Sequence, residues 1–155
     1  MTDEDYLRRA IALAAQAEAA GDVPIGAVLV CGDLVVEAKN EKESRPDPSA
    51  HAEMLAIREA AHRLGVWRLG GATLYVTKEP CLMCAGAIIA ARIERLVFGA
   101  HDPKGGAAGS VIDAFASPVA NHRVAVTGGI LEEETSKQLR AFFERRRNKE
   151  KETEL

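Results

Sequence analysis

The chain has 155 residues and a formal net charge of −3 at pH 7, with 47% hydrophobic and 28% charged residues. A chain of this length buries about 70% of the surface that it exposes when unfolded, and this composition excludes a disordered protein. No apolar run approaches the ~18 residues of a membrane span, and the acidic start at 2–5 is unlike a secretory signal. Three cysteines are too few for a disulfide framework, so we expect a cytoplasmic protein. The net negative charge argues against a uniformly basic nucleic-acid-binding protein.

The segment 2–20 predicts a first helix, because Thr2 and Asp5 fit a capping box and apolar residues recur at helical spacing. Two β-branched runs at 25–30 and 34–38, separated by a turn, predict a hairpin that is followed by a loop over 40–49. The rest of the chain alternates between predicted helices at 51–64, 81–91, 111–115 and 131–149 and predicted strands at 73–77, 96–99 and 123–126. This order favours a three-layer α/β/α domain with a mixed, mainly parallel five-stranded sheet.

Two short segments carry candidate metal ligands at the predicted starts of two helices. They are His-Ala-Glu at 51–53 and Pro-Cys-Leu-Met-Cys at 80–84. Cys81 and Cys84 are three residues apart and therefore share one helix face. Together with His51 they provide three ligands of a tetrahedral zinc site, and the fourth position stays open for water, as a catalytic zinc requires.

Glu53 lies two positions beyond His51, which is about 200° around a regular helix. The two side chains can therefore converge only where the chain enters the helix, so we expect the metal at the N-terminal ends of both helices. There Glu53 would not bind the metal but would accept a proton from the zinc-activated water and pass it to the substrate.

Other interpretations of the cysteine pair remain open. A lone Cys-x-x-Cys also fits half of a structural zinc knuckle or a redox pair. A knuckle would need a further ligand from Cys31, His62, His101 or His122, none of which forms a second paired motif. A redox pair leaves Glu53 unexplained, and so does a non-catalytic zinc or RNA-binding module.

The combined signature His-x-Glu and Pro-Cys-x-x-Cys resembles that of zinc-dependent nucleobase deaminases. Further segments resemble the bacterial tRNA-specific adenosine deaminases over about 7–147: Val23–Val28, Asp47–Glu53, Thr73–Thr77, Glu79–Ala87, Gly105–Ser110, Asn121–Val124 and Phe142–Phe143. The resemblance implies a cytidine deaminase-like fold, with a single deaminase domain over 1–147 and a polar tail over 148–155. It also implies conversion of adenosine to inosine at the wobble position of a tRNA anticodon, chiefly in an arginine tRNA.

For the site, the resemblance implies one Zn²⁺ per subunit, bound by His51, Cys81 and Cys84, with Glu53 as the proton shuttle. It implies a homodimer that binds an anticodon stem-loop. It assigns substrate contacts to four residues: Asn40, Ala52, Asp102 and Phe143. The zinc signature by itself is shared by deaminases of free bases and nucleosides, such as guanine, cytosine or cytidine, which stay the alternative.

The residues themselves leave several of these assignments open. Asn40 also fits a turn cap. Phe142 and Phe143 point about 100° apart on a helix, so we expect one to reach RNA and the other to join the core. The Gly-rich segment 105–110 is expected to pack near the site or a dimer interface. The run 140–151 has six basic and two acidic residues, which suits either a helix C-terminus or an RNA contact.

Overall fold

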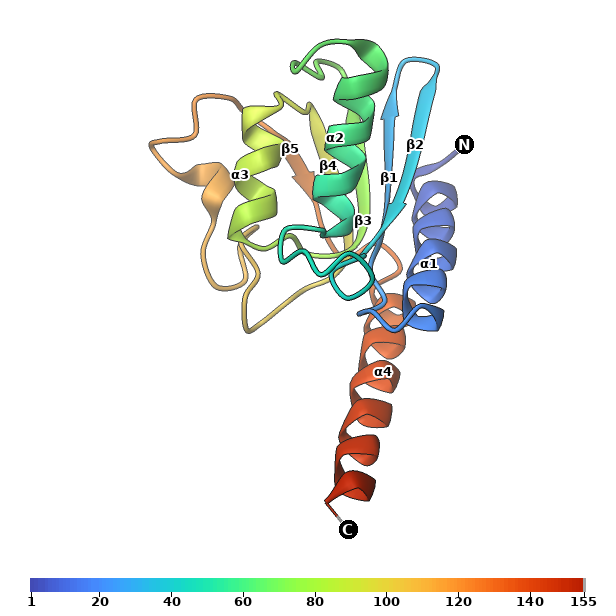
Figure 1. Cartoon of the computed structure of the whole chain (residues 1–155). Helices are drawn as coiled ribbons and strands as arrows, with labels where there is room; N and C mark the ends of the chain where they lie inside the picture. Colours follow the sequence, from blue (N-terminus) through green and yellow to red (C-terminus); the bar gives the residue numbers. More distant parts are fainter. Residues whose placement is uncertain (155) are drawn as a thin grey trace.

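A five-stranded sheet with the order β2-β1-β3-β4-β5 lies at the centre of the computed structural model, which describes residues 1–154 (Figure 1). Its strands are β1 (Gly26–Cys31), β2 (Leu34–Lys39), β3 (Thr73–Lys78), β4 (Arg95–Ala100) and β5 (Ala125–Thr127). The strand β1 pairs antiparallel with both β2 and β3, whereas β3–β4 and β4–β5 are parallel pairs. Four strands therefore run in one direction and β1 runs in the other, which confirms the mixed, mainly parallel sheet.

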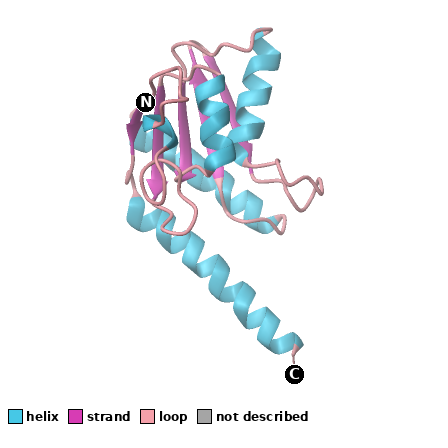
Figure 2. Ribbon diagram, turned by 90° about the vertical axis from the view of Figure 1, so that its left-hand side faces the viewer, coloured by secondary structure: helices cyan, strands magenta, loops and turns pink. Residues whose placement is uncertain are grey.

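Helices cover both faces of this sheet (Figures 1 and 2). They are α1 (Asp3–Ala19), α2 (Ala52–Leu64), α3 (Leu82–Ala90) and α4 (Glu132–Thr153). The side chains of Val28, Tyr75 and Val97 pack with α1 on one face, and their neighbours Leu29, Leu74 and Leu96 pack with α2 and α3 on the other. Because two helical layers bury successive side chains, the strands are apolar on both faces, as their sequences predicted.

The predicted capping box forms at α1, and α2 ends at the residue predicted for the helix 51–64. Thr2 accepts a hydrogen bond from the Asp5 amide at 3.1 Å, and Asp5 accepts one from the Thr2 amide at 2.8 Å, which completes the capping box. The helix α2 ends at Gly65, whose φ of 69° lies in the left-handed region that glycine adopts without strain.

The C-terminal third differs from the prediction in three boundaries. The short helix expected at 111–115 is a 3₁₀ turn at Ala114–Ala116, and the strand expected at 123–126 is β5 at Ala125–Thr127. The helix α4 does not end near residue 149 but continues to Thr153, so residues 148–153 of the expected polar tail are helical. No glycine or proline interrupts α4, which extends beyond the sheet (Figures 1 and 2).

Within residues 1–154, no helix has the length and hydropathy needed to cross a membrane.

Candidate metal centre

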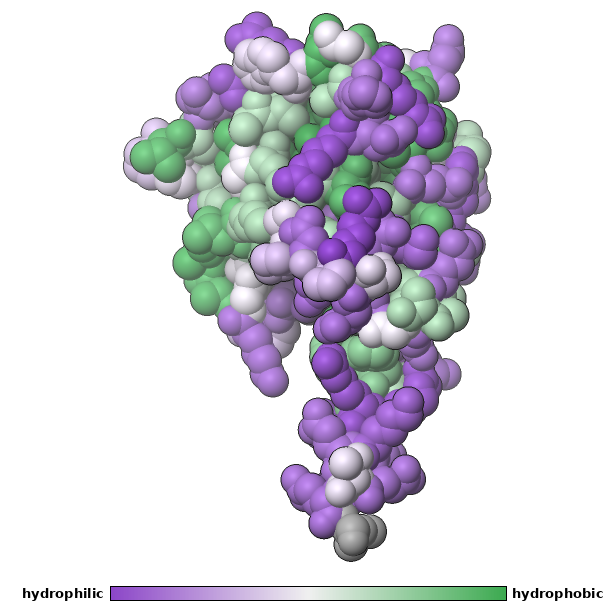
Figure 3. Space-filling model, in the orientation of Figure 1, coloured by the Kyte–Doolittle hydropathy of each residue, from purple (hydrophilic) through white to green (hydrophobic). Residues whose placement is uncertain are grey.

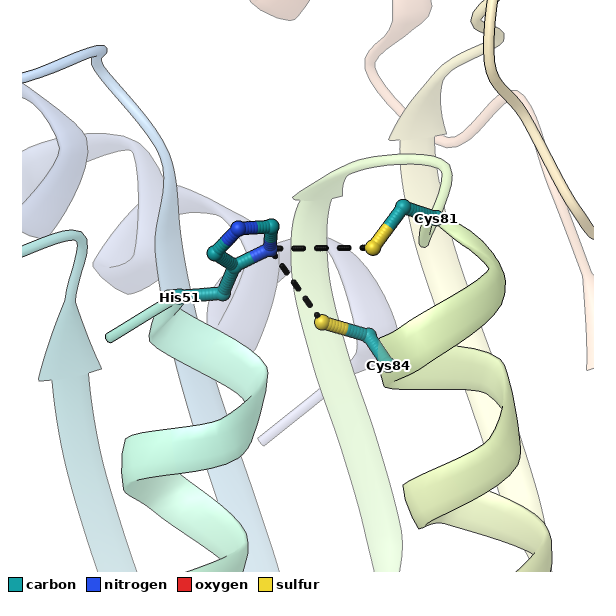
Figure 4. Close-up of side chains that lie close together, drawn as sticks. All are labelled: His51, Cys81 and Cys84. Carbon is teal, nitrogen blue, oxygen red and sulfur yellow. Dashed lines mark hydrogen bonds between the residues drawn. The ribbon is translucent and has the colours of Figure 1, made fainter. Parts of the chain in front are cut away.

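The N-terminal ends of α2 and α3 bring His51, Cys81 and Cys84 together (Figure 4). His51 is the N-cap residue of α2, Cys81 is the N-cap residue of α3, and Cys84 lies in the first turn of α3. Their ligand atoms all lie within 4.8 Å of one another. The Nδ1 atom of His51 is 3.4 Å from the Cys84 sulfur and 3.7 Å from the Cys81 sulfur.

These distances fit a shared tetrahedral metal ion. Zinc–nitrogen and zinc–sulfur bonds at a tetrahedral angle place the two ligand atoms about 3.6 Å apart. A hydrogen bond from Cys84, together with one from His51, lowers the pKa of Cys81 to about 3 despite its partial burial. This favours the thiolate form of Cys81, which is the form that binds metals. The same hydrogen bond, followed by burial, raises the pKa of Cys84, so Cys84 would give up its proton on binding a metal.

The other candidate ligands lie elsewhere in the described chain. His101 pairs with Glu132 at 2.6 Å, and the Nε2 atom of His122 lies 2.9 Å from the Ile93 carbonyl oxygen. His62 is exposed, and the Cys31 thiol lies near the Gly70 carbonyl. Within residues 1–154, the group has three protein ligands, which is the number found in catalytic rather than structural zinc sites.

Glu53 is buried at the second position of α2, with only 4% of its surface exposed. It is not a member of the three-ligand group. Burial raises the pKa of its carboxyl group, so this carboxyl can hold a proton more readily than an exposed one. Its position suits a general acid and base beside the three ligands.

Asn40 and Ala52 lie together directly beside these residues. The Oδ1 atom of buried Asn40 accepts a hydrogen bond from the Ala52 amide at 2.8 Å. Asn40 directly follows β2. Its hydrogen bond to the Ala52 amide caps the N-terminus of α2, since the N-cap residue His51 makes no side-chain cap of its own. Because Oδ1 faces an N–H donor, the Nδ2 group of Asn40 points away from that amide.

Asp102 and Phe143 belong to a second group, which lines a groove of about 680 Å³ between the loop after β4 and α4. We call it the α4 groove; its charged lining residues are Lys78, Asp102, Lys104, Arg140, Glu144 and Arg147. Phe143 is 38% exposed in this groove. Lys78 is separated from Cys81 by two residues, so the groove lies close to the metal ligands along the chain.

The structure corrects the expectation about Phe142 and shows that the basic residues of 140–151 have different surroundings. Phe142 does not join the core; it is half-buried, with the Arg146 guanidinium 5.8 Å from its ring centroid. Arg140 and Arg147 line the α4 groove, whereas Arg145 pairs with Glu18 of α1. Part of the basic run therefore faces the groove and part serves contacts within the fold.

Glu79 is a residue of the site region that sequence reasoning did not assign. Its buried carboxylate accepts hydrogen bonds from the amides of Asp102 at 2.9 Å, Ala108 at 2.9 Å and Ser110 at 3.1 Å, and from the Ser110 hydroxyl. Burial would raise the pKa of Glu79, but these donors outweigh it and lower the pKa. An acidic residue between an apolar strand and the Pro-Cys segment was the available signal.

Glu79 thereby holds the loop 102–110 against the segment that carries the cysteines. The Ala107 amide also donates to the Pro80 carbonyl at 2.9 Å, and Gly106 leaves no room for a Cβ atom beside the Glu79 carboxylate. The expectation that the Gly-rich segment packs near the site is confirmed.

The sequence of this chain is similar to those of known deaminases. The profile of the MafB19-like deaminase family matches residues 1–147. The tRNA-specific adenosine deaminase of Bacillus subtilis (strain 168) is 51% identical, with 96% of this chain and 93% of the relative covered. The Haemophilus influenzae protein of the same name is 48% identical, with 96% of this chain and 87% of the relative covered.

Among solved structures, this chain is more similar to a tRNA adenosine deaminase structure than to a guanine deaminase. A structure from work on A-to-I editing by tRNA:A34 deaminases has a TM-score of 0.84 and 45% identity, and the match covers 87% of this chain and 99% of that one. A Bacillus subtilis guanine deaminase has a TM-score of 0.65 and 34% identity, with coverage of 96% and 95%. The tRNA-specific relatives match over nearly the full length of this chain and of their own sequences, and their identity to it is higher than that of the guanine deaminase. This chain therefore belongs to the family of tRNA-specific adenosine deaminases.

Proposed function

We propose that this protein hydrolytically deaminates adenosine to inosine at the wobble position of a tRNA anticodon. The observation that carries the proposal is the buried Glu53 carboxylate beside three convergent metal ligands, in a chain 51% identical to a tRNA-specific adenosine deaminase. A free-base deaminase would use the same chemistry, but the higher identity to the tRNA enzymes favours the RNA substrate.

The resident metal of this proposal is one Zn²⁺ per subunit, held by His51, Cys81 and Cys84. Two thiolates and an imidazole form a donor set that selects zinc over hard cations, and their spacing supports tetrahedral binding. When bound, zinc would act as a Lewis acid and lower the pKa of a water molecule toward ~7.

Glu53 moves the protons of the reaction. It accepts one proton from the attacking water as the water oxygen bonds to C6 of adenine, and it delivers that proton to the ring nitrogen N1. It then transfers the second proton of the water to the exocyclic amine, so that the C6–N bond breaks and ammonia leaves. The raised pKa of the buried carboxyl supports a group that both accepts and donates.

Asn40 and Ala52 orient the purine beside Glu53. The Asn40 Oδ1 atom is occupied by the Ala52 amide, which leaves Nδ2 as the donor toward the base. The Ala52 side chain is fully buried in the core, so Ala52 contributes through the amide that holds Asn40 in place. The unpaired bases of an anticodon loop make extrusion of the adenine inexpensive.

Asp102 and Phe143 contact the RNA outside this pocket. Phe143 offers an exposed ring for stacking, and the α4 groove has four basic and two acidic lining residues besides His101. This local excess of positive charge suits a phosphate backbone even though the whole chain has a net charge of −3.

A homodimer in the cytoplasm completes the proposal. A second groove, of about 670 Å³, lies between α3 and the segment 111–121, and the hydrophobic surface over this region is visible in Figure 3. Leu82, Ile112 and Val119 are 61%, 46% and 88% exposed there, which supports a covering subunit. Light scattering should then give twice the chain mass of 16.6 kDa, and a monomer at micromolar concentration would contradict this part of the proposal.

The test of the activity compares four substrates: an arginine-tRNA anticodon stem-loop, adenosine, cytidine and guanine. We expect efficient turnover of the stem-loop alone.

The Glu53→Gln variant should keep its metal and lose about 10³-fold in rate, because it cannot accept the proton. Glu59→Gln is the matched control, since Glu59 lies on the same helix and pairs with Arg63 at the surface. Turnover of free guanine or cytidine without the stem-loop would refute the assignment.

A further inference from the structure

Lys78 ends the strand β3 with its ammonium group against the carboxylate of Asp102. The Nζ atom lies 3.2 Å from Oδ2, and the two side chains are 26% and 19% exposed in the α4 groove. The sheet itself imposes this pairing. Lys78 is in parallel register with Ala100, and Asp102 lies two residues further along the chain.

Asp102 is also fixed from two other directions. Its Oδ1 atom accepts a hydrogen bond from the Lys104 amide at 3.0 Å, and its own amide donates to Glu79 at 2.9 Å. Burial would raise the pKa of Asp102, but the Lys104 amide and the Lys78 ammonium outweigh it and lower the pKa. Asp102 is therefore ionised at neutral pH, and both of its oxygens have partners before any ligand enters.

An ionised carboxylate in this groove is unfavourable for RNA unless a cation compensates it. A phosphodiester in the groove would face Arg140 and Arg147 of α4, but also Glu144 and Asp102. Lys78 is the side chain that pairs with Asp102. Without Lys78, the groove would keep three basic residues and two acidic ones, and Asp102 would lose its ion pair.

We propose that Lys78 is a positioning residue for the RNA substrate: it orients the Asp102 carboxylate and compensates its charge, so that an acidic side chain can face an RNA strand in the α4 groove. Lys78 acts through Asp102 rather than on the reacting atoms. The inference rests on the proposed RNA substrate. It adds one residue, Lys78, which offsets the negative charge of Asp102 where the groove would bind the RNA strand.

The kinetic test is a double-mutant cycle on the anticodon stem-loop with Lys78→Met, Asp102→Asn and both together. We expect Lys78→Met to raise KM about tenfold, as for the loss of one charge-assisted hydrogen bond, with kcat and metal content unchanged. In the Asp102→Asn background the same substitution should change KM by less than about twofold, because no charge remains to compensate. Lys78→Arg should restore most of the affinity.

Lys149→Met is the matched control for the loss of one positive charge. Lys149 lies on α4 and is exposed but does not line the groove, so its removal should leave KM unchanged within about twofold. An equal effect of Lys78→Met in both Asp102 backgrounds would overturn the proposal, since Lys78 would then act on the RNA independently of Asp102.

A second measurement separates this inference from the proposed function, because it needs no RNA. Carboxyl-carbon NMR of the metal-loaded protein should show Asp102 titrating at a higher pH in Lys78→Met than in the unmodified chain. An unchanged titration overturns the pairing, even in an active enzyme. If the titration shifts while the unmodified chain fails to deaminate the stem-loop, the pairing stands and the proposed function fails.

Discussion

His51 and Cys81 both occupy N-cap positions, and neither uses its side chain to cap its helix. Their backbones are extended, with φ and ψ of −75° and 148° at His51 and −75° and 175° at Cys81. Each side chain therefore leaves the helix at its end and points toward the other (Figure 4). The free N–H groups and positive dipole ends of α2 and α3 surround the ligands and favour thiolates.

At the residue scale, Cys84→Ser should lower metal content from one equivalent to well below one half. A serine hydroxyl stays protonated and is a poor zinc ligand, so only His51 and Cys81 would remain. Metal analysis after dialysis measures the loss. Cys31→Ser is the matched control, because this half-buried thiol lies at the end of β1 near Gly70 and should leave metal content unchanged. Full metal content in Cys84→Ser would contradict the ligand assignment.

At the scale of elements, the close approach of α1 to β1 depends on Gly26. A Cβ atom at this position would lie 2.8 Å from both the Ala14 amide nitrogen and the Leu13 Cβ atom of α1. The helix backbone supplies part of this contact and cannot rotate away as a side chain could. The helix α1 lies over β1 and β3, so this one contact sets the spacing of a whole layer.

Gly26→Ala should therefore destabilise the fold by about 1–3 kcal/mol, because α1 must move outward from the sheet. The measurement is the free energy of unfolding in urea. Gly70→Ala provides the control, since nothing lies within 4 Å of a Cβ atom there. Equal stability of the two variants would show that α1 adjusts without cost.

At the scale of the whole molecule, the N-terminal helix is tied to the centre of the sheet by one polar cluster. The Tyr75 hydroxyl of β3 donates to Asp3 at 2.9 Å, and the Arg95 guanidinium of β4 donates to the same carboxylate at 2.9 Å. Burial, followed by the hydrogen bond to Asp3, raises the pKa of Tyr75 to about 12. The neutral Tyr75 phenol thus joins β3 to α1, beside the direct ion pair of Arg95 with Asp3.

This cluster predicts a pH dependence of stability on the alkaline side. The folded pKa of Tyr75 is raised above the ordinary value of 10.0, so its contribution is complete below pH 10 and is lost as pH rises toward about 12. The difference in unfolding free energy between the unmodified chain and Tyr75→Phe should be constant near pH 8–9 and shrink above pH 10. A difference that stays constant up to pH 12 would contradict the raised pKa.

The sequence by itself determined those features that depend on neighbouring residues. They are the capping box of α1, the end of the helix predicted at 51–64 and the alternation of strands and helices, which all follow from local backbone and packing preferences. The spacing of His51 and Glu53 also placed the candidate metal ligands at helix N-termini, because two residues 200° apart can converge only there. The end of α4 was missed because no glycine or proline marks it.

Only the tertiary structure decided the contacts between distant segments. Three polar contacts show this. Asn40 caps the Ala52 amide 12 positions away, Lys78 pairs with Asp102 24 positions away, and Glu79 binds Ser110 31 positions away. The first depends on how the loop after β2 folds against α2, and the other two on the parallel register of β3 with β4. Sequence periodicity reports which face of an element is buried, but it does not report which element lies opposite, and these polar contacts depend on that neighbour.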